Sequence, residues 1–271
     1  MTLEFLAHLD LSAASGLVHR DGLLYSVADD GLELLRTELD GSKPMRLPLS
    51  DTPARTHIAK SKKPDFEALI SVGRELLAIG SGSTAARCFA ISLDPESLVR
   101  RTIDLRPLYS ALSGTLHELN IEGAVITQDA VFLAQRGNGA RKQNALVRLD
   151  RGVFERELTC GVLTAACLQS VTSVALETFE GVSLSLTDLC SGPGSQLIFT
   201  AAAEATENPY DDGVVSGSIV GVIDHSGLAT WRVIAPGVKL EGVCWLNGEL
   251  RLVADPDDPS ARAPLFRVAW D

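Results

Sequence analysis

The stretch Asn120-Ile121-Glu122-Gly123-Ala124 decides the fold, because copies of it recur along the chain. Close copies are Asp65-Phe66-Glu67-Ala68-Leu69 and Lys239-Leu240-Glu241-Gly242-Val243, and weaker ones are Ala14-Ser15-Gly16-Leu17 and Leu186-Thr187-Asp188-Leu189. Aligned on residues 15, 67, 122, 187 and 241, the copies are 52, 55, 65 and 54 residues apart. Repeats of this length are typical of the blades of a β-propeller, since helical solenoid repeats are usually shorter.

Each repeat continues as a series of strands separated by turns. A turn such as Leu246-Asn247-Gly248 follows each phrase and leads into a second apolar run typical of a strand. Asp-Gly turns, including Asp150-Arg151-Gly152, predict hairpins from the third strands into the fourth. Second strands are expected at 22–27, 75–79, 130–134, 196–200 and 249–253, third strands at 32–39, 87–93, 145–149, 218–223 and 264–270, and fourth strands at 45–49, 99–105, within 153–179 and at 229–234.

The fifth repeat lacks a fourth strand, and the N-terminus can supply one. Leu3, Phe5, Ala7, Leu9 and Leu11 alternate with mostly polar neighbours, which is the pattern of a half-buried strand. A ring closed in this way has no open sheet edge. We therefore predict an all-β, single-domain, five-bladed β-propeller over 1–271, closed by the N-terminal strand. Six blades are the alternative, because 152–180 is long enough to hold extra strands; short helical turns are expected within 95–100 and 108–119, and a surface loop at 204–217.

Composition restricts the class of function. The chain has 24 Lys and Arg against 35 Asp and Glu, a net charge of −11. This argues against nucleic-acid binding, which depends on neutralising phosphates. No segment approaches the ~18 apolar residues of a membrane span, and the N-terminus lacks the features of a secretory signal. The five cysteines form no C-x-x-C pair, which favours reduced thiols. We expect a cytoplasmic protein with neither nucleic acid nor membrane as partner.

The repeated phrases resemble those of bacterial β-propellers in the neighbourhood of the esterase-like phytase and SdiA-regulated families. The residues that carry the resemblance are 65–69, Ile121-Glu122-Gly123, and 239–243 followed by Val253-Ala254-Asp255. Thr187-Asp188-Leu189 and 199–204 add a similarity to a family of uncharacterised propellers. For the phytase-like families the resemblance implies calcium and phosphoester hydrolysis. For the more distant gluconolactonase-like propellers it implies a divalent metal held by Glu, Asn and Asp in the central channel.

Three carboxylates occupy equivalent positions in the repeat: Glu67, Glu122 and Glu241. If each begins the innermost strand of its blade, the three converge at the mouth of the channel. Converging carboxylates repel unless they are protonated, paired or bound to a cation, and oxygen-rich sites suit Ca²⁺ or Mg²⁺. The alternative interpretation is structural, with each glutamate bracing its own blade or pairing with an arginine.

Polar residues at the ends of the second strands form another candidate set. They are Asp29-Asp30, Ser81-Gly82-Ser83, Gln135-Arg136-Gly137-Asn138, Glu204 and Asp255. Arg136 with Asn138, and Arg87 after a Gly-rich turn, could bind a carboxylate or phosphate group of a ligand. Either arginine could instead neutralise the glutamates. His117 precedes Glu122 and is a further candidate for ligand binding or acid–base chemistry.

The sequence contains no recognisable nucleophile or general-base set, so no reaction follows from it. It equally carries no signal for an oligomeric state. The first functional hypothesis is a binding or scaffold propeller without catalysis, whose central channel holds a small molecule or a cation. The alternative is a metal-dependent hydrolase of phosphoesters or lactones, with Glu67, Glu122 and Glu241 as ligands of a calcium or magnesium ion and Arg136 orienting an anionic substrate.

Overall fold

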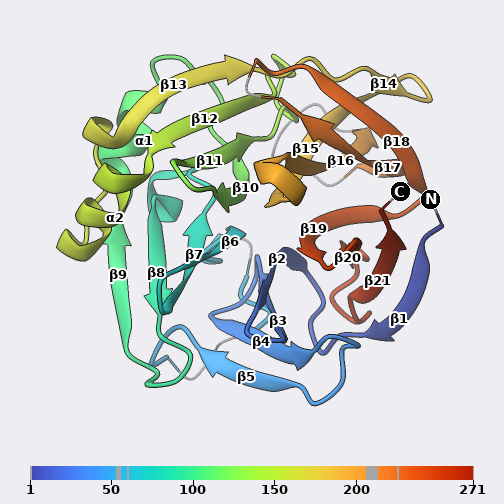
Figure 1. Ribbon diagram of the computed structural model, residues 1–271, viewed down its shortest axis with the longest axis horizontal. Coiled ribbons are helices and arrows are strands. Elements are labelled where there is room, and N and C mark those ends of the chain that lie inside the picture. Colours follow the sequence, from blue (N-terminus) through green and yellow to red (C-terminus); the bar gives the residue numbers. More distant parts are fainter. Residues whose placement is uncertain (1, 53–55, 60, 206–212, 225, 271) are drawn as a thin grey trace.

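The computed structural model describes residues 2–52, 56–59, 61–205, 213–224 and 226–270. Within them the chain forms five antiparallel sheets around a central axis, which is the arrangement of a five-bladed β-propeller (Figure 1). The predicted fold class is confirmed, and the six-bladed alternative is wrong.

Each blade runs from an inner strand at the axis to an outer strand at the rim. Blade one contains β2 (Ala14–Arg20), β3 (Leu23–Ala28), β4 (Glu33–Glu38) and β5 (Met45–Pro48), and blade two contains β6 (Phe66–Val72), β7 (Glu75–Gly80), β8 (Phe89–Leu93) and β9 (Arg100–Asp104). Blade three contains β10 (Ile121–Ile126), β11 (Ala130–Gln135), β12 (Ala145–Asp150) and β13 (Leu168–Ser173). Blade four contains β15 (Val182–Ser191), β16 (Leu197–Ala205), β17 (Val214–Ile223) and β18 (Ala229–Pro236), with the short β14 (Thr178–Phe179) paired to β15.

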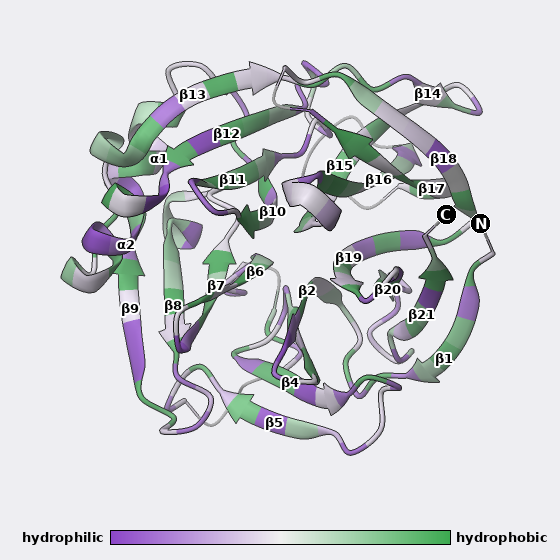
Figure 2. Ribbon diagram, viewed as in Figure 1, coloured by the Kyte–Doolittle hydropathy of each residue, from purple (hydrophilic) through white to green (hydrophobic). Residues whose placement is uncertain are grey.

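Blade five closes the ring with strands from both ends of the chain. Its strands are β19 (Lys239–Leu246), β20 (Glu249–Asp255), β21 (Pro264–Ala269) and β1 (Glu4–His8). β1 pairs antiparallel with β21, so that Glu4 lies opposite Arg267, and the two side chains also form an ion pair at 2.8 Å. The predicted N-terminal closing strand is therefore confirmed. In Figure 2, the rim strand β5 alternates apolar and hydrophilic residues, whereas β1 has three consecutive apolar residues between hydrophilic ends.

The repeated phrase marks an irregularity that all five inner strands share. In each inner pair the register shifts by one residue, between Ala14 and Gly16, Phe66 and Ala68, Ile121 and Gly123, Leu186 and Asp188, and Leu240 and Gly242. The skipped residues are the aligned ones: Ser15, Glu67, Glu122, Thr187 and Glu241. A β-bulge bends the strand and redirects one side chain, so the repeat encodes one redirected position in each blade.

The glycine after the bulge lets neighbouring blades approach closely. A Cβ atom on Gly123 would lie 2.6 Å from the Cα atom of Asp188 in blade four, and one on Gly16 would lie 2.8 Å from the backbone nitrogen of Leu69 in blade two. Real Cβ atoms do not tolerate such contacts without a shift of the backbone. The Glu-Gly pair therefore combines a redirected side chain with tight packing between blades.

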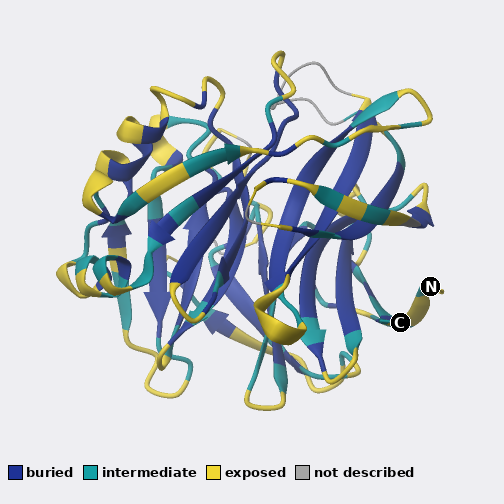
Figure 3. Cartoon of the chain, turned by 45° about the horizontal axis from the view of Figure 1, so that its top comes forward, coloured by how far each residue is buried: buried dark blue, intermediate teal, exposed yellow. Residues whose placement is uncertain are grey.

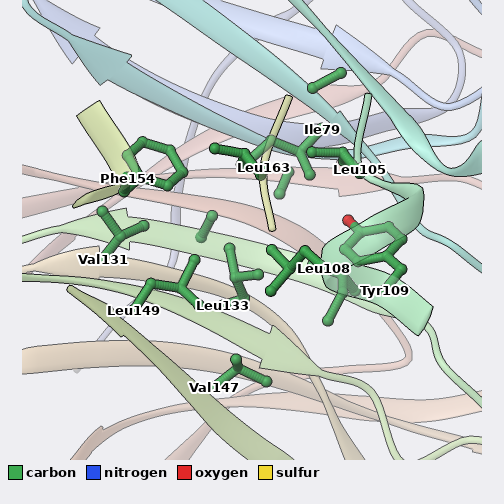
Figure 4. Packing of buried hydrophobic residues seen from close by; sticks show 14 of the residues in the cluster. Ile79, Leu105, Leu108, Tyr109, Val131, Leu133, Val147, Leu149, Phe154 and Leu163 are labelled. Atoms are coloured by element: carbon green, nitrogen blue, oxygen red, sulfur yellow. The ribbon is translucent and has the colours of Figure 1, made fainter. Parts of the chain in front are cut away.

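Apolar side chains fill the space between blades, and exposed residues are confined mostly to loops, rim strands and helices (Figure 3). The largest cluster lies between blades two and three and includes Ile79, Val131 and Leu149 (Figure 4). Two helices cover it, α1 (Arg106–Leu112) and α2 (Arg151–Cys160), and Tyr109 of α1 donates a hydrogen bond to the carbonyl of Gly80 at 2.7 Å. Short 3-10 helices occur at Ala85–Arg87, Ala165–Cys167 and Pro193–Ser195.

Helix α2 corrects one sequence-based prediction. Asp150-Arg151-Gly152 does not form a hairpin into a fourth strand, because the Asp150 side chain accepts a hydrogen bond from the Val153 amide at 2.8 Å and caps α2. The length of 152–180 is thus taken up by a helix and the outer strand β13 rather than by a further blade.

The predicted loop at 204–217 is shorter than expected, since Glu204 belongs to β16 and Val214 to β17, and 206–212 lie outside the described residues. No helix in the described ranges has both the length and the apolar character needed to cross a membrane.

Candidate binding pocket in the central channel

A pocket of about 380 Å³ lies where the inner strands begin and the second strands end. All five blades contribute to it, through the starts of β2, β6, β10 and β19 and the ends of second strands such as β11 and β16. Ten of its lining residues are Asp or Glu and four are Lys or Arg. The pocket therefore has an excess of acidic groups, in line with the charge of the whole chain.

The structure brings the three glutamates of the repeat together. Glu67, Glu122 and Glu241 all line the pocket and are all more than nine-tenths buried. Ser15, the bulge residue of blade one, also lines it. Thr187 does not: its hydroxyl donates to the carbonyl of Leu240 at 2.7 Å and ties blade four to blade five. Blade four supplies Glu204 instead, from the end of β16.

Arg136 neutralises the carboxylates on one side of the pocket. Its guanidinium lies 3.2 Å from Glu122 and 3.7 Å from Glu241, and it also forms an ion pair with Glu204. The arginine side chain is 6% exposed, so these contacts are largely screened from water. This half of the pocket, made of Glu122, Arg136, Glu204 and Glu241, is called the arginine side below.

Lys239 adds a second cation beside Glu241. Its ammonium lies 3.3 Å from Glu241, 2.9 Å from Asp257 and 3.7 Å from Asp255. Lys239 stands two residues before Glu241 on β19, and the bulge at Glu241 turns the glutamate toward the same pocket. The same spacing places Asp65 beside Glu67 and Asn120 beside Glu122, and Asn120 donates a hydrogen bond to Glu122.

A different arrangement, called the lysine side below, consists of Asp29, Lys63, Asp65 and Glu67. The Lys63 ammonium lies 2.9 Å from Asp65 Oδ1 and also pairs with Asp29. The other oxygen of Asp65, Oδ2, accepts hydrogen bonds from Arg87 at 2.8 Å, from Ser83 at 3.2 Å and from Ser81. Asp65 is therefore held rigidly with one oxygen secured and the other presented to Lys63.

Two buried carboxylates lack hydrogen bonds. Neither oxygen of Glu241 has a hydrogen-bond partner in the described part of the chain, although Lys239 and Arg136 are close enough for electrostatic attraction. Glu67 is 9% exposed, and no hydrogen bond or ion pair to it is found among the described residues. A buried charged group without hydrogen-bond partners costs free energy. Lys239 and Arg136 offset part of this cost for Glu241, so Glu67 is the carboxylate better suited to receive a positive charge from outside.

The pKa values of several carboxyl groups in the pocket are raised, because burial outweighs the attraction of the few cations nearby. Burial raises the pKa of Glu122 to about 7 despite the attraction of Arg136, and burial raises the pKa of Asp255 to about 8 despite Lys239. The pKa of Glu67 is raised well above its usual value by burial and by repulsion from Glu122. Burial would lower the pKa of Lys63, but Glu67, Asp29 and Asp65 together raise it.

The positions of the other predicted residues differ from one another. Arg136, Asn138 and Arg87 all line the pocket, and both arginines point at carboxylates there. His117 is exposed and lines a separate surface depression with Thr115 and Arg141, away from the glutamates. Proximity to Glu122 in the sequence was misleading, because residues 117–120 form an irregular segment before β10 and only Asn120 reaches the pocket.

One group of residues has the spacing of a metal site. Oxygens of Asp29, Asp65 and Glu67 lie within 4.8 Å of one another. This triad shares only Glu67 with the predicted set Glu67, Glu122 and Glu241. The other two glutamates of that set pair with Arg136 instead. Sequence reasoning missed Lys63, Asp65 and Lys239 as pocket residues. Asp65 and Lys239 could have been found, because each stands two residues before a glutamate of the repeat. No feature of the sequence marks Lys63.

The fold and pocket define the class: a five-bladed β-propeller with an acidic central pocket. Within this class, the chain belongs to a family of unknown function, DUF6929, whose model matches residues 10–269. This confirms the expectation of an uncharacterised propeller family in general terms; the finer likeness to phytase-like and SdiA-regulated propellers has no support among the comparisons. No curated protein matches the sequence.

Two solved structures illustrate the likeness in fold. The glutaminyl cyclase of Myxococcus xanthus superposes with a TM-score of 0.58 at 14% identity, over 100% of this chain and 98% of that chain. The arabinanase Arb43A of Bacillus subtilis superposes with a TM-score of 0.54 at 13% identity, over 97% of this chain and 96% of that chain. At such identities the similarity establishes the fold alone.

Proposed function

We propose that the protein binds a small, positively charged ligand in the central pocket. The observation that carries this proposal is the pair Glu67 and Glu241, two buried carboxylates that face the pocket without hydrogen bonds. A ligand with an ammonium or guanidinium group, or a metal ion, would give Glu67 the ion-pair partner that it lacks and would give both carboxylates the hydrogen bonds or metal–oxygen contacts that they lack.

The engagement of the pocket's own cations supports a cationic ligand over an anionic one. Arg136 is surrounded by Glu122, Glu204 and Glu241, and Lys239 by Glu241, Asp255 and Asp257. Arg87 and Lys63 are both held by Asp65. An anionic substrate would have to break these pairs and then face the remaining carboxylates, which makes the predicted role of Arg136 in orienting an anion unfavourable.

The second candidate is a metal-dependent hydrolase, and the acidic triad Asp29, Asp65 and Glu67 is the observation that favours it. A divalent ion held there could lower the pKa of a bound water or polarise a scissile group. The two similar propellers described above are enzymes by name, so the fold is compatible with catalysis.

The five cysteines are all free thiols, which supports the expectation of a reducing, cytoplasmic location.

Calorimetric titration with a panel of cations tests the binding proposal. Putrescine, arginine methyl ester, guanidinium, Ca²⁺ and Mg²⁺ are titrated at pH 8 into the wild-type protein and into Glu67→Gln and Glu241→Gln. At least one cation should bind the wild type, and at least one of these two variants should weaken that binding by about tenfold or more, which is about 1.4 kcal/mol.

The matched control is Glu96→Gln. Glu96 is a surface carboxylate that is 83% exposed, and it pairs with Arg74, which does not line the pocket. Binding to this variant should equal that to the wild type. Absence of binding by every cation, or equal binding by all three variants, would contradict the proposal. Hydrolysis of p-nitrophenyl phosphate or of a γ-lactone that depends on Ca²⁺ or Mg²⁺ and on Glu67 would instead favour the hydrolase.

A further inference from the structure

We propose that Asp29, Asp65 and Glu67 form a site for a divalent cation, and that the Lys63 ammonium rests on this site until the ion displaces it. The inference rests on the cation-binding function proposed above. It goes further by assigning the ion to the lysine side of the pocket and by giving Lys63 a role in setting the affinity.

The spacing of the three carboxylates suits a hard divalent ion. Oxygens that bind one Ca²⁺ lie about 2.3–2.6 Å from it, so that any two of them are at most about 5 Å apart. The triad meets this condition, with its oxygens within 4.8 Å of one another. Asp29 follows β3 of blade one, whereas Asp65 and Glu67 come from the start of blade two. The site therefore bridges two blades, and water would complete the coordination.

Glu67 is an independent indication that this site takes a ligand. It is 9% exposed, lines the pocket and has no hydrogen bond or ion pair to any described residue. The bulge between Phe66 and Ala68 directs it into the pocket rather than along the sheet. A glutamate that only braced its blade would have a partner in the protein.

Asp65 is organised for binding in advance. Arg87, Ser81 and Ser83 all donate to Oδ2, which fixes the carboxylate and leaves Oδ1 pointing at the triad. Oδ1 contacts Lys63 at 2.9 Å. A preorganised oxygen of this kind reduces the conformational entropy that is lost when an ion binds.

Lys63 has the properties of a replaceable stand-in. It supplies one positive charge to three carboxylates: it forms ion pairs with Asp29 and Asp65, and it is attracted by Glu67 without forming an ion pair with it. Its side chain is 14% exposed, more than that of Asp65 at 5%, and its neighbours Lys62 and Ser61 are exposed. A lysine is a mobile point charge on a flexible stem, so it can turn toward solvent when an ion of higher charge takes its place.

The affinity for Ca²⁺, measured calorimetrically on EDTA-treated protein at pH 8, tests the assignment. Lys63→Met should bind Ca²⁺ at least about tenfold more tightly than the wild type, because a competing positive charge is removed. Glu67→Gln should bind at least about tenfold more weakly. Lys62→Met, which removes the adjacent exposed lysine, should bind as the wild type does.

Lys63→Gln serves as a second variant in case methionine disturbs folding, and thermal unfolding shows that each variant is folded. If neither Lys63 variant binds Ca²⁺ more tightly, displacement of the lysine is refuted. If Glu67→Gln binds as the wild type does, the site is refuted. If putrescine or guanidinium binds but neither the wild type nor Lys63→Met binds Ca²⁺ or Mg²⁺, this inference fails while the proposed function stands; if no cation binds, both fail.

Discussion

The two sides of the pocket handle a similar concentration of carboxylates in different ways. On the arginine side, Arg136 contacts Glu122, Glu204 and Glu241 from three blades and is almost completely buried. On the lysine side, Lys63 contacts only two of three acids and is partly exposed. A guanidinium offers five fixed donors, whereas an ammonium is a mobile point charge. This difference indicates that Arg136 is held permanently by its carboxylates, whereas the carboxylates of the lysine side can exchange Lys63 for another cation.

Loss of Arg136 should have the largest effect on stability. Arg136→Met leaves Glu122, Glu204 and Glu241 buried without their shared cation, and breaking a buried ion pair from one side costs about 3–5 kcal/mol. We expect the free energy of unfolding in urea to fall by that amount, and by clearly less for Lys63→Met. Arg106→Met removes an arginine that is 73% exposed and should change little. Equal losses for Arg136→Met and Lys63→Met would break the comparison.

The pH dependence of stability should show the burial of Glu122 on the arginine side. Its pKa is about 7 in the folded protein against about 4.5 in the unfolded chain. Between these values the unfolded chain loses the proton first, so rising pH favours unfolding, by up to about 3 kcal/mol in total. Below pH 4.5 this carboxyl group is protonated in both states and contributes no slope.

Urea unfolding of the wild type and Glu122→Gln from pH 4.5 to 8 measures this effect. The free energy of unfolding of the wild type minus that of the variant should decrease as pH rises from 4.5 toward 7. Glu122 is repelled by Glu241, Asp65 and Glu67 and attracted by Arg136 and Lys239, all of which the variant retains. A difference that stays constant or grows with pH would mean that Arg136, rather than burial, controls the proton on Glu122.

The smallest expected effect has the opposite sign and belongs to the lysine side. Glu67→Gln should stabilise the EDTA-treated protein by about 1 kcal/mol at pH 8. Burial and repulsion from Glu122 raise the pKa of Glu67, so at this pH the folded protein must either keep a buried charge or hold a proton that the unfolded chain has released, and glutamine avoids both costs. Thermal or urea unfolding checks the sign. Destabilisation by more than about 1 kcal/mol would mean that Glu67 braces its blade, and the distinction between the two sides would then disappear.

The sequence predicted the fold well because the repeat combines two local signals. Alternating apolar residues mark each strand, and the Glu-Gly and Ser-Gly phrases mark the bulge and the close approach of blades at Gly123 and Gly16. The exception is α2, where Asp150-Arg151-Gly152 has the composition of a turn, but the Asp150 side chain caps a helix. Turns and helix starts favour the same residues, so composition alone does not separate them.

The site was less predictable because its pairing depends on contacts between blades. The repeat was sufficient to place Glu67, Glu122 and Glu241 around one pocket. It could not show that Arg136 pairs with Glu204, 68 residues away, or that Lys63 lies between Asp29 and Asp65. Lys63 precedes β6 outside any repeat, so no periodicity marks it. His117 shows the converse, since closeness in sequence to Glu122 did not bring it to the pocket.

The bulge in each inner strand has a consequence for how such a pocket can evolve. Four of the five blades present one side chain to the pocket from a bulge position that their apolar core does not use, so that residue can be exchanged while the blade still folds. Serine at 15 and glutamate at 67, 122 and 241 are one combination of such choices, whereas Thr187 ties blade four to blade five and is not free to change in the same way. A related chain could acquire a new ligand by single substitutions at these positions, with the blades themselves left intact.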